Sequence, residues 1–307
     1  MYFSAVKDVD FVFLSALAMR GPQGEQTTMT TLKEALDSET ESLIARSGAT
    51  VPLDWPTKPK AAAPSTGRVA ADQSALFMSE SIEGLNLGAH FLDRLSGDEK
   101  AQVQAAGRDV LVSQGEMVFS QGEYHDGIFI IRRGQVRVYY TAPSGREITL
   151  AYWTAGHFVG GPEISGFGVH MWSGVAIEDC EITALSRRAL QTLLLQVPSF
   201  ALAMIDGLIA KGKCYSSMAQ MLGTRSVIER LAQYLLNLAE LYGIADGNTV
   251  VIDRKVTHDQ IAAMVGSTRQ WVTMMLKRFQ TKHIISIEGS VIRIDRLDLL
   301  KKMLFRD

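Results

Sequence analysis

Residues 257–279 read THDQIAAMVGSTRQWVTMMLKRF, a pattern typical of two short helices joined by a glycine turn. Thr257 is a suitable N-cap for the first helix, because its hydroxyl can accept a hydrogen bond from a free backbone N–H. Gly266 stands where the chain must turn, and glycine adopts the left-handed conformation at low cost. Helical spacing gives the first helix one apolar face: Ile261, Met264 and Val265. The stretch therefore predicts a helix-turn-helix.

The second helix of this pair is predicted to begin at Ser267 or Thr268 and to expose a polar face. Its inward positions are apolar: Val272, Met275, Leu276 and Phe279. An arginine such as Arg269 can donate two hydrogen bonds to guanine, and a glutamine such as Gln270 can pair with adenine. We expect DNA contacts from six residues: Ser267, Thr268, Arg269, Gln270, Thr273 and Lys277.

The surrounding sequence favours DNA binding over the alternative of an ordinary amphipathic helical hairpin. Residues 283–294 alternate apolar and polar side chains on both sides of Glu288-Gly289-Ser290, which predicts a β-hairpin and hence a winged helix. Residues 224–307 contain 13 Lys plus Arg and 9 Asp plus Glu, a net charge of +4, whereas the whole chain carries −2. A locally basic module, with Lys277, Arg278 and Lys282 near the helix end, suits the phosphate backbone.

The composition is that of a cytoplasmic globular protein with two domains. The chain has 307 residues, of which 47% are hydrophobic, enough for two separate cores. No apolar run reaches the roughly 18 residues of a membrane span, and the N-terminus lacks the cationic start of a secretion signal. The two cysteines, Cys180 and Cys214, are expected to stay reduced and are too few for a four-thiolate iron–sulfur cluster.

The chain divides into four predicted regions. Residues 1–75 form a leader of unassigned role that ends in a Pro/Ala-rich linker, with few core residues. Residues 76–196 contain a capping box at Ser96-Gly-Asp-Glu99, which predicts the start of a helix. Between Arg108 and Ser186 they continue as short β-branched and aromatic runs separated by glycines, which predicts an antiparallel barrel or jelly roll. Residues 197–223 predict one long helix, and residues 224–307 the winged helix.

The long helix carries a three-four spacing of mainly apolar residues, typical of a coiled-coil seam, with Lys211 as its polar interruption. We expect these residues to pair two copies of the chain: Ala201, Met204, Leu208, Lys211, Tyr215, Met218 and Leu222. The alternative is that the same stripe packs on its own roll. A two-fold dimer would place two recognition helices about one DNA turn apart.

Four segments, in their order and spacing, resemble the Crp/Fnr family, which includes the cyclic-AMP receptor protein and the fumarate-nitrate reduction regulator. They lie at residues 122–138, 156–160, 230–239 and 257–279, and the resemblance covers about residues 85–304. It implies an α+β protein with an effector-sensing β-roll like that of cyclic-nucleotide-binding domains, a long dimerisation helix and a C-terminal winged helix-turn-helix. It also implies a transcriptional regulator, not an enzyme, that binds a palindromic site in double-stranded DNA as a homodimer and contacts RNA polymerase if it is an activator.

The recognition helix departs from the family pattern at two positions. Arg269 is kept, but Gln270 replaces the family's glutamate and Met274 replaces its second arginine. We therefore expect a half-site related to that of the family but not identical to it.

The effector region departs from the family as well. Residues 160–173 read GGPEISGFGVHMWS, and Trp172 stands where cyclic-AMP binders carry the phosphate-binding arginine. A phosphate buried there without a cationic partner would be costly, so a cyclic nucleotide is not the expected effector. We expect instead a hydrophobic or aromatic small molecule, held by Glu163, Phe167, His170, Met171, Trp172, Ser173, Tyr215, Ser216 and Met218.

Three alternatives remain for the sensing part. Haem-based gas or redox sensing would use ligands from His157, His170, Met171 and Cys180, with His170 the first candidate. An enzyme could pair Glu163 with His170, but no nucleophile, metal-ligand spacing or phosphate-binding glycine loop accompanies them. The third alternative is a DNA-binding protein that needs no effector. No metal site is expected.

Overall fold

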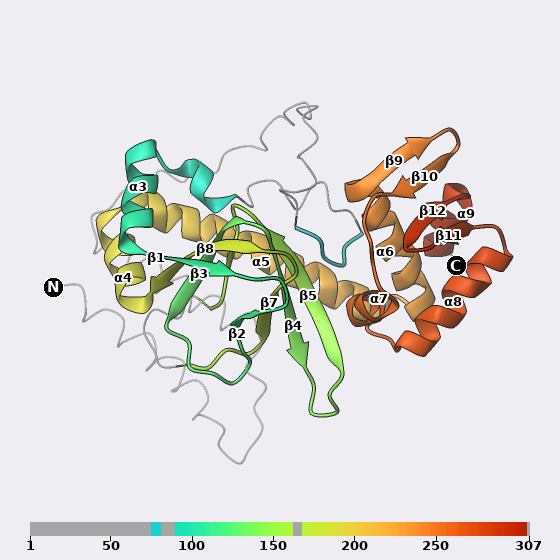
Figure 1. Ribbon diagram of the computed structural model, residues 1–307, viewed down its shortest axis with the longest axis horizontal. Helices are drawn as coiled ribbons and strands as arrows, with labels where there is room; N and C mark the ends of the chain where they lie inside the picture. Colours follow the sequence, from blue (N-terminus) through green and yellow to red (C-terminus); the bar gives the residue numbers. More distant parts are fainter. Residues whose placement is uncertain (1–74, 81–89, 162–167, 306–307) are drawn as a thin grey trace, which may run out of the picture. The chain divides into compact units, whose positions relative to one another are not determined.

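An antiparallel β-roll precedes a long helix and a small α/β domain. The computed structural model describes residues 75–80, 90–161 and 168–305 (Figure 1). All of these belong to one of the two compact units of the chain, Gly67–Asp307. The predicted leader and linker, apart from Ala75, lie outside the described residues.

The roll consists of two four-stranded antiparallel sheets, as the sequence predicts. Their orders are β1-β8-β3-β6 and β2-β7-β4-β5. The strands are β1 (Arg108–Val112), β2 (Met117–Phe119), β3 (Gly127–Arg133), β4 (Gln135–Thr141), β5 (Glu147–Thr154), β6 (Phe158–Val159), β7 (Ser173–Ala176) and β8 (Cys180–Ser186). Gly127 shows why glycine separates these runs: it has a φ of +126°, and a Cβ there would lie 1.9 Å from the Leu185 carbonyl oxygen.

Helices flank the roll on its N- and C-terminal sides. They are the 3-10 helix η2 (Phe91–Arg94), α3 (Gly97–Ala106), α4 (Arg187–Gln196) and α5 (Pro198–Thr224). The predicted capping box at Ser96 and Glu99 is present at the start of α3. Pro198 opens α5, where its missing N–H costs no helical hydrogen bond.

The stripe of α5 that we predicted as a dimer seam lies mainly against the roll of the same chain. Met204 belongs to a buried cluster with Ile128 and Phe158 of the roll. Lys211 lies over the Trp153 ring, and Tyr215 packs on Trp172. The physical reason is that the open side of the roll needs an apolar cover, which this stripe supplies.

These contacts occupy part of the predicted seam, whose pairing with a second chain stays a prediction. Of the predicted set only Leu208 is an exposed large hydrophobic residue, whereas these are buried or partly buried: Ala201, Met204, Lys211, Tyr215, Met218 and Leu222. A neighbouring stripe of α5 is exposed instead. It contains Leu202, Ile205 and Ile209, which are 51%, 52% and 50% exposed.

The C-terminal part is a winged helix with its own core. Its elements are α6 (Val227–Tyr242), β9 (Gly243–Asp246), β10 (Thr249–Ile252), α7 (His258–Val265), α8 (Arg269–Thr281), β11 (Ile285–Glu288), β12 (Val291–Ile294), α9 (Leu297–Lys302) and the 3-10 helix η3 (Met303–Phe305). The predicted hairpin is present as β11 and β12, in a sheet of order β11-β12-β10-β9. A second hairpin, β9–β10, was not predicted. None of the described helices is by itself long and apolar enough to cross a membrane, although α4 and α5, bent by 116°, reach that length and composition together.

Substitution of Gly266 by alanine should destabilise the winged helix. Its φ of +66° lies in the left-handed region, and the added Cβ would lie 3.3 Å from Leu222 Cδ2. We expect Gly266→Ala to lower the free energy of unfolding by about 1–2 kcal/mol in urea denaturation. Gly97→Ala is the control, because a Cβ there meets nothing within 4 Å. Equal stability of both variants would show that the turn carries no strain.

Candidate nucleic-acid interface

The helix-turn-helix forms as the sequence predicts, and each boundary has a local cause. The Thr257 hydroxyl accepts a hydrogen bond from the Gln260 N–H at 3.2 Å, and the Gln260 side chain accepts one from the Thr257 N–H at 2.8 Å. Gly266 adopts the left-handed conformation that ends α7, with its N–H bonded to the Ala262 carbonyl oxygen. The Thr268 hydroxyl then caps α8 by accepting from the Trp271 N–H at 3.3 Å.

The inner faces of both helices are buried as predicted. The residues concerned are Ile261, Met264, Val265, Val272, Met275, Leu276 and Phe279. Arg230 of α6 is a buried charge that the sequence analysis did not single out. Its guanidinium donates to the carbonyl oxygens of Val265 and Arg225, both at 2.8 Å, and so ties α6 to the end of α7. An arginine inside the apolar run of residues 230–239 was the available signal.

The outer face of α8 carries the residues we assigned to DNA. Thr268, Arg269, Gln270, Thr273 and Lys277 are exposed, and Ser267 is partly exposed. Met274, at the place of the family's second arginine, is exposed on the same helix.

Two residues of α7 that the sequence analysis did not name contact this face. Asp259 pairs with Arg269 at 3.5 Å, with side chains 65% and 69% exposed. His258 Nδ1 lies 2.8 Å from the Thr273 hydroxyl oxygen. An exposed ion pair contributes about 0–1 kcal/mol, so the Arg269 guanidinium can exchange Asp259 for a base edge at little cost.

The described residues among those predicted to bind an effector are not gathered around one pocket. Glu163 and Phe167 lie outside the described residues. The buried His170 ring lies 4.5 Å from the Phe119 ring, and the buried Ser173 hydroxyl accepts from the Gln121 N–H at 3.0 Å. The Trp172 and Tyr215 rings pack together, with centroids 6.0 Å apart.

The other predicted effector residues point elsewhere. Met171 is 70% exposed, Ser216 is exposed, and Met218 packs against the core of the winged helix. The described members of the set are therefore not brought together at one place in the single chain, and their role in effector binding stays a prediction. Residues adjacent in an extended segment point to opposite faces, and successive residues of α5 diverge around the helix.

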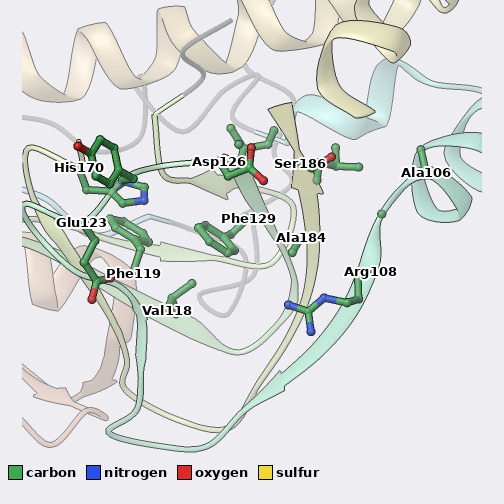
Figure 2. A pocket seen from close by; sticks show the side chains of 15 residues that line it. Ala106, Arg108, Val118, Phe119, Glu123, Asp126, Phe129, His170, Ala184 and Ser186 are labelled. Atoms are coloured by element: carbon green, nitrogen blue, oxygen red, sulfur yellow. The ribbon is translucent and has the colours of Figure 1, made fainter. Parts of the chain in front are cut away.

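A cavity of about 470 Å³ opens at one end of the roll and shares only His170 with the predicted set. The Phe119 and Phe129 rings, stacked with centroids 5.7 Å apart, line it. Figure 2 shows His170 and Glu123 at one end of this cavity and Arg108 at the other. Aromatic rings flanked by charges can accept a small polar aromatic molecule.

Lys211 brings a cation into the interior of the roll. Its Nζ lies 3.8 Å from the Trp153 ring centroid and 4.6 Å from that of Phe158. Trp153 Nε1 and His157 Nε2 are buried without a hydrogen-bond partner. Burial lowers the pKa of Lys211 to about 7, and burial together with the Lys211 charge lowers the pKa of His157 to about 3. Residues 160–173 contain no Lys or Arg to pair with the phosphate of a cyclic nucleotide, whereas Lys211 comes from α5.

The candidate haem ligands have separate surroundings. His157 packs between His90 and Trp153, and His170 lies beside Phe119 and His125. The Cys180 thiol donates to the Glu178 carbonyl oxygen at 3.2 Å, and burial raises its pKa to about 11. Within the described ranges, no three His, Cys, Asp or Glu side chains are grouped so as to hold a metal ion.

Replacement of Lys211 by methionine should stabilise the protein at neutral pH. The unfolded lysine has a pKa of 10.5 and the folded one about 7, so the unfolded state binds more protons between these values. The penalty is complete below pH 7 and disappears as the pH rises towards 10.5. We expect Lys211→Met to raise the free energy of unfolding at pH 7 by about 1–3 kcal/mol, since the contacts with the two rings offset part of the desolvation. Urea denaturation from pH 6 to 10 measures this, with the exposed Lys213→Met as control; a gain that does not change with pH would contradict the account.

Two family models match the chain over the parts described above. The model of the cyclic nucleotide-binding domain matches residues 110–197. The model of the Crp-like helix-turn-helix domain matches residues 229–303. The roll and the winged helix are thus recognised separately and in the expected order.

Relatives with assigned roles share both parts. The chain is 27% identical over 190 residues to the CRP-like cAMP-activated global transcriptional regulator of Mycobacterium tuberculosis, covering 62% of this chain and 84% of that protein. It is 27% identical over 191 residues to the global nitrogen regulator of Synechococcus elongatus, covering 59% and 82%. The solved structure of the c-di-GMP responsive global regulator CLP of Xanthomonas campestris has the same fold, with a TM-score of 0.60 at 20% identity over 65% of this chain and 99% of that one. The relatives are regulators and not enzymes, and this chain belongs to the Crp/Fnr family of transcriptional regulators.

Proposed function

We propose that the chain binds a palindromic operator as a homodimer and that a small molecule bound by the roll controls this binding. The observation that carries the proposal is the exposed N-terminal end of α8, where Arg269, Gln270 and Thr273 face solvent on a winged helix. In this proposal residues 76–196 sense the effector, residues 197–223 pair two chains, and residues 224–307 read DNA.

The chemistry of α8 suits sequence-specific reading of the major groove. Arg269 can donate two hydrogen bonds to guanine O6 and N7, and Gln270 can bind adenine through its amide. Both residues lie in the first turn of α8, which is the part of a recognition helix that reaches base edges. Lys277 lies two turns further along and suits a phosphate.

The exposed stripe of α5 supports dimer formation. Leu202, Ile205 and Ile209 form a three-four spacing on the face opposite the roll. The same spacing continues through small or polar exposed residues: Gly212, Ser216, Ala219 and Gly223. A second copy of this helix would bury the aliphatic side chains, and small residues further along would let the two helices approach closely.

The contact between Trp172 and Tyr215 gives the proposed effector a route to α5. Trp172 and Tyr215 join the roll to α5, so a molecule that alters their packing could move α5. An effector must prefer one arrangement over the other, since equal affinity for both shifts nothing. A hydrophobic or aromatic molecule remains our proposal. None of the described contacts favours haem.

Removal of the Arg269 side chain should abolish operator specificity. Loss of a bidentate contact to guanine costs about 1–3 kcal/mol, which corresponds to a loss of affinity of roughly tenfold to a hundredfold. We expect this loss for Arg269→Ala in gel-shift titrations with a duplex selected by the unsubstituted chain, while affinity for unrelated duplex stays nearly unchanged. The control is Arg133→Ala, an exposed arginine on the roll. An unchanged operator affinity in Arg269→Ala would remove this residue from the interface.

A double substitution in the exposed stripe should produce monomers. Ile205→Glu with Ile209→Glu would place two carboxylates in an apolar helix pair, where burial of unpaired charge is costly. We expect light scattering to give the mass of one chain for this variant and of two chains for the unsubstituted protein. Leu195→Glu, an exposed leucine on α4, should remain dimeric. Dimers in the double variant would place the interface elsewhere.

A further inference from the structure

Residues 75–80 lie at the boundary between the predicted linker, to which only Ala75 belongs, and the predicted roll, and they are buried. Ala75, Leu76, Phe77, Met78 and Ser79 are all between 0% and 2% exposed. A flexible connection between domains would not bury five consecutive side chains. The segment is therefore part of the folded structure, including Ala75, which was predicted to belong to the linker.

Alternate side chains of this segment enter two different cores. Ala75 and Phe77 belong to the core of the roll. Leu76 and Met78 belong to the core formed mainly by the winged helix. An extended chain directs successive side chains to opposite faces. The segment thus lies between the two domains and packs on both.

Backbone and side-chain bonds hold both faces of the segment. The Leu76 N–H donates to the Tyr152 carbonyl oxygen at 3.0 Å, and the Tyr152 N–H donates to the Leu76 carbonyl oxygen at 2.8 Å, which joins the segment to β5. On the other side, Asn237 of α6 donates its Nδ2 to the carbonyl oxygens of Phe77 and Ser79, at 3.2 and 3.1 Å.

Two further residues of the C-terminal part complete these contacts. Gln233 donates to Asn237 Oδ1 at 2.8 Å, which orients the Asn237 amide, and to the Glu80 carbonyl oxygen at 3.3 Å. Arg225 pairs with the Glu80 carboxylate at 2.7 Å. Asn237 is fully buried, and a buried amide on an apolar helix face is tolerated only when its hydrogen bonds are made. The buried amide of α6 is therefore matched to this segment.

We propose that residues 75–80 act as a clasp that holds the winged helix on the roll and so sets the affinity of the chain for its operator. The inference rests on the proposed DNA-binding function. The main chain joins α5 to α6 through the short break at Arg225 and Ser226. Direct contacts between the roll and the winged helix, such as that of Arg254 Nη2 with Gln135 Oε1 at 2.8 Å, act together with those of the segment. Two recognition helices that must fit half-sites at a fixed spacing lose affinity when their orientation is free, because binding must then order them.

The test weakens the contacts of residues 75–80 by two separate substitutions, one in α6 and one in the segment itself. Asn237→Leu keeps the size of the side chain and removes both donors to the clasp. Leu76→Ala shortens a clasp side chain and leaves α6 unchanged, so a folding failure of one variant does not decide the question. Asn248→Leu is the matched control, because it makes the same change at the exposed β9–β10 turn.

Two measurements on the full chain decide the proposal. Hydrogen exchange should show the Leu76 and Tyr152 amides exchanging at least tenfold faster in both clasp variants than in the control, with the β3 amides unchanged. Gel-shift titration with a duplex selected from a random library by the unsubstituted chain should show at least a fivefold loss of operator affinity in the clasp variants. Unchanged exchange, or faster exchange with unchanged affinity, overturns the clasp. An unsubstituted chain that selects no duplex overturns the DNA-binding proposal instead, so the two failures are distinguishable.

Discussion

Helix α5 is apolar on two faces, and its own roll can bury only one of them. The face with Met204 and Tyr215 covers the roll, while Leu202, Ile205 and Ile209 stay in solvent. Exposed aliphatic side chains in a three-four spacing favour pairing with a second helix. This division of α5 is the constraint on which the proposed regulator depends. A conformational change in the roll would then move α5, and α5 would pass the movement to the partner chain and to the winged helix that follows it.

In the winged helix, the residues that form the core differ from those proposed to contact DNA. Apolar residues of α7 and α8 form the core, and the Gly266 turn fixes the angle at which the two helices meet. The polar residues at the start of α8 contribute little to that core. Among the described residues, the Arg269 side chain pairs with Asp259, and this pair is exposed, so the guanidinium remains available to a ligand. Function can therefore vary at α8 without loss of the fold, which fits the departures of Gln270 and Met274 from the family pattern.

Local signals made the helix-turn-helix, its caps and the glycine turns of the roll predictable. Thr257, Gly266 and Thr268 act within a few residues of their own position, so spacing alone identifies them. The face of α5 was not predictable in this way. The stripes through Met204 and Leu208 and through Ile205 and Ile209 have nearly the same spacing, and contact with the roll decides between them.

The effector residues and the clasp escaped prediction for related reasons. Neighbours in sequence such as Met171 and Trp172 diverge in space, while Lys211 reaches the roll from a distant helix. Residues 75–80 follow a proline- and alanine-rich stretch, and only their contacts with Tyr152 and Asn237 show that they are part of the fold.

Hydroxyl-radical footprinting of the selected operator tests the central claim most directly. Two α8 helices held by paired α5 helices should protect two symmetry-related half-sites whose centres lie about 10 base pairs apart, on one side of the duplex. Protection of a single half-site, or uniform protection without two-fold symmetry, would contradict the account.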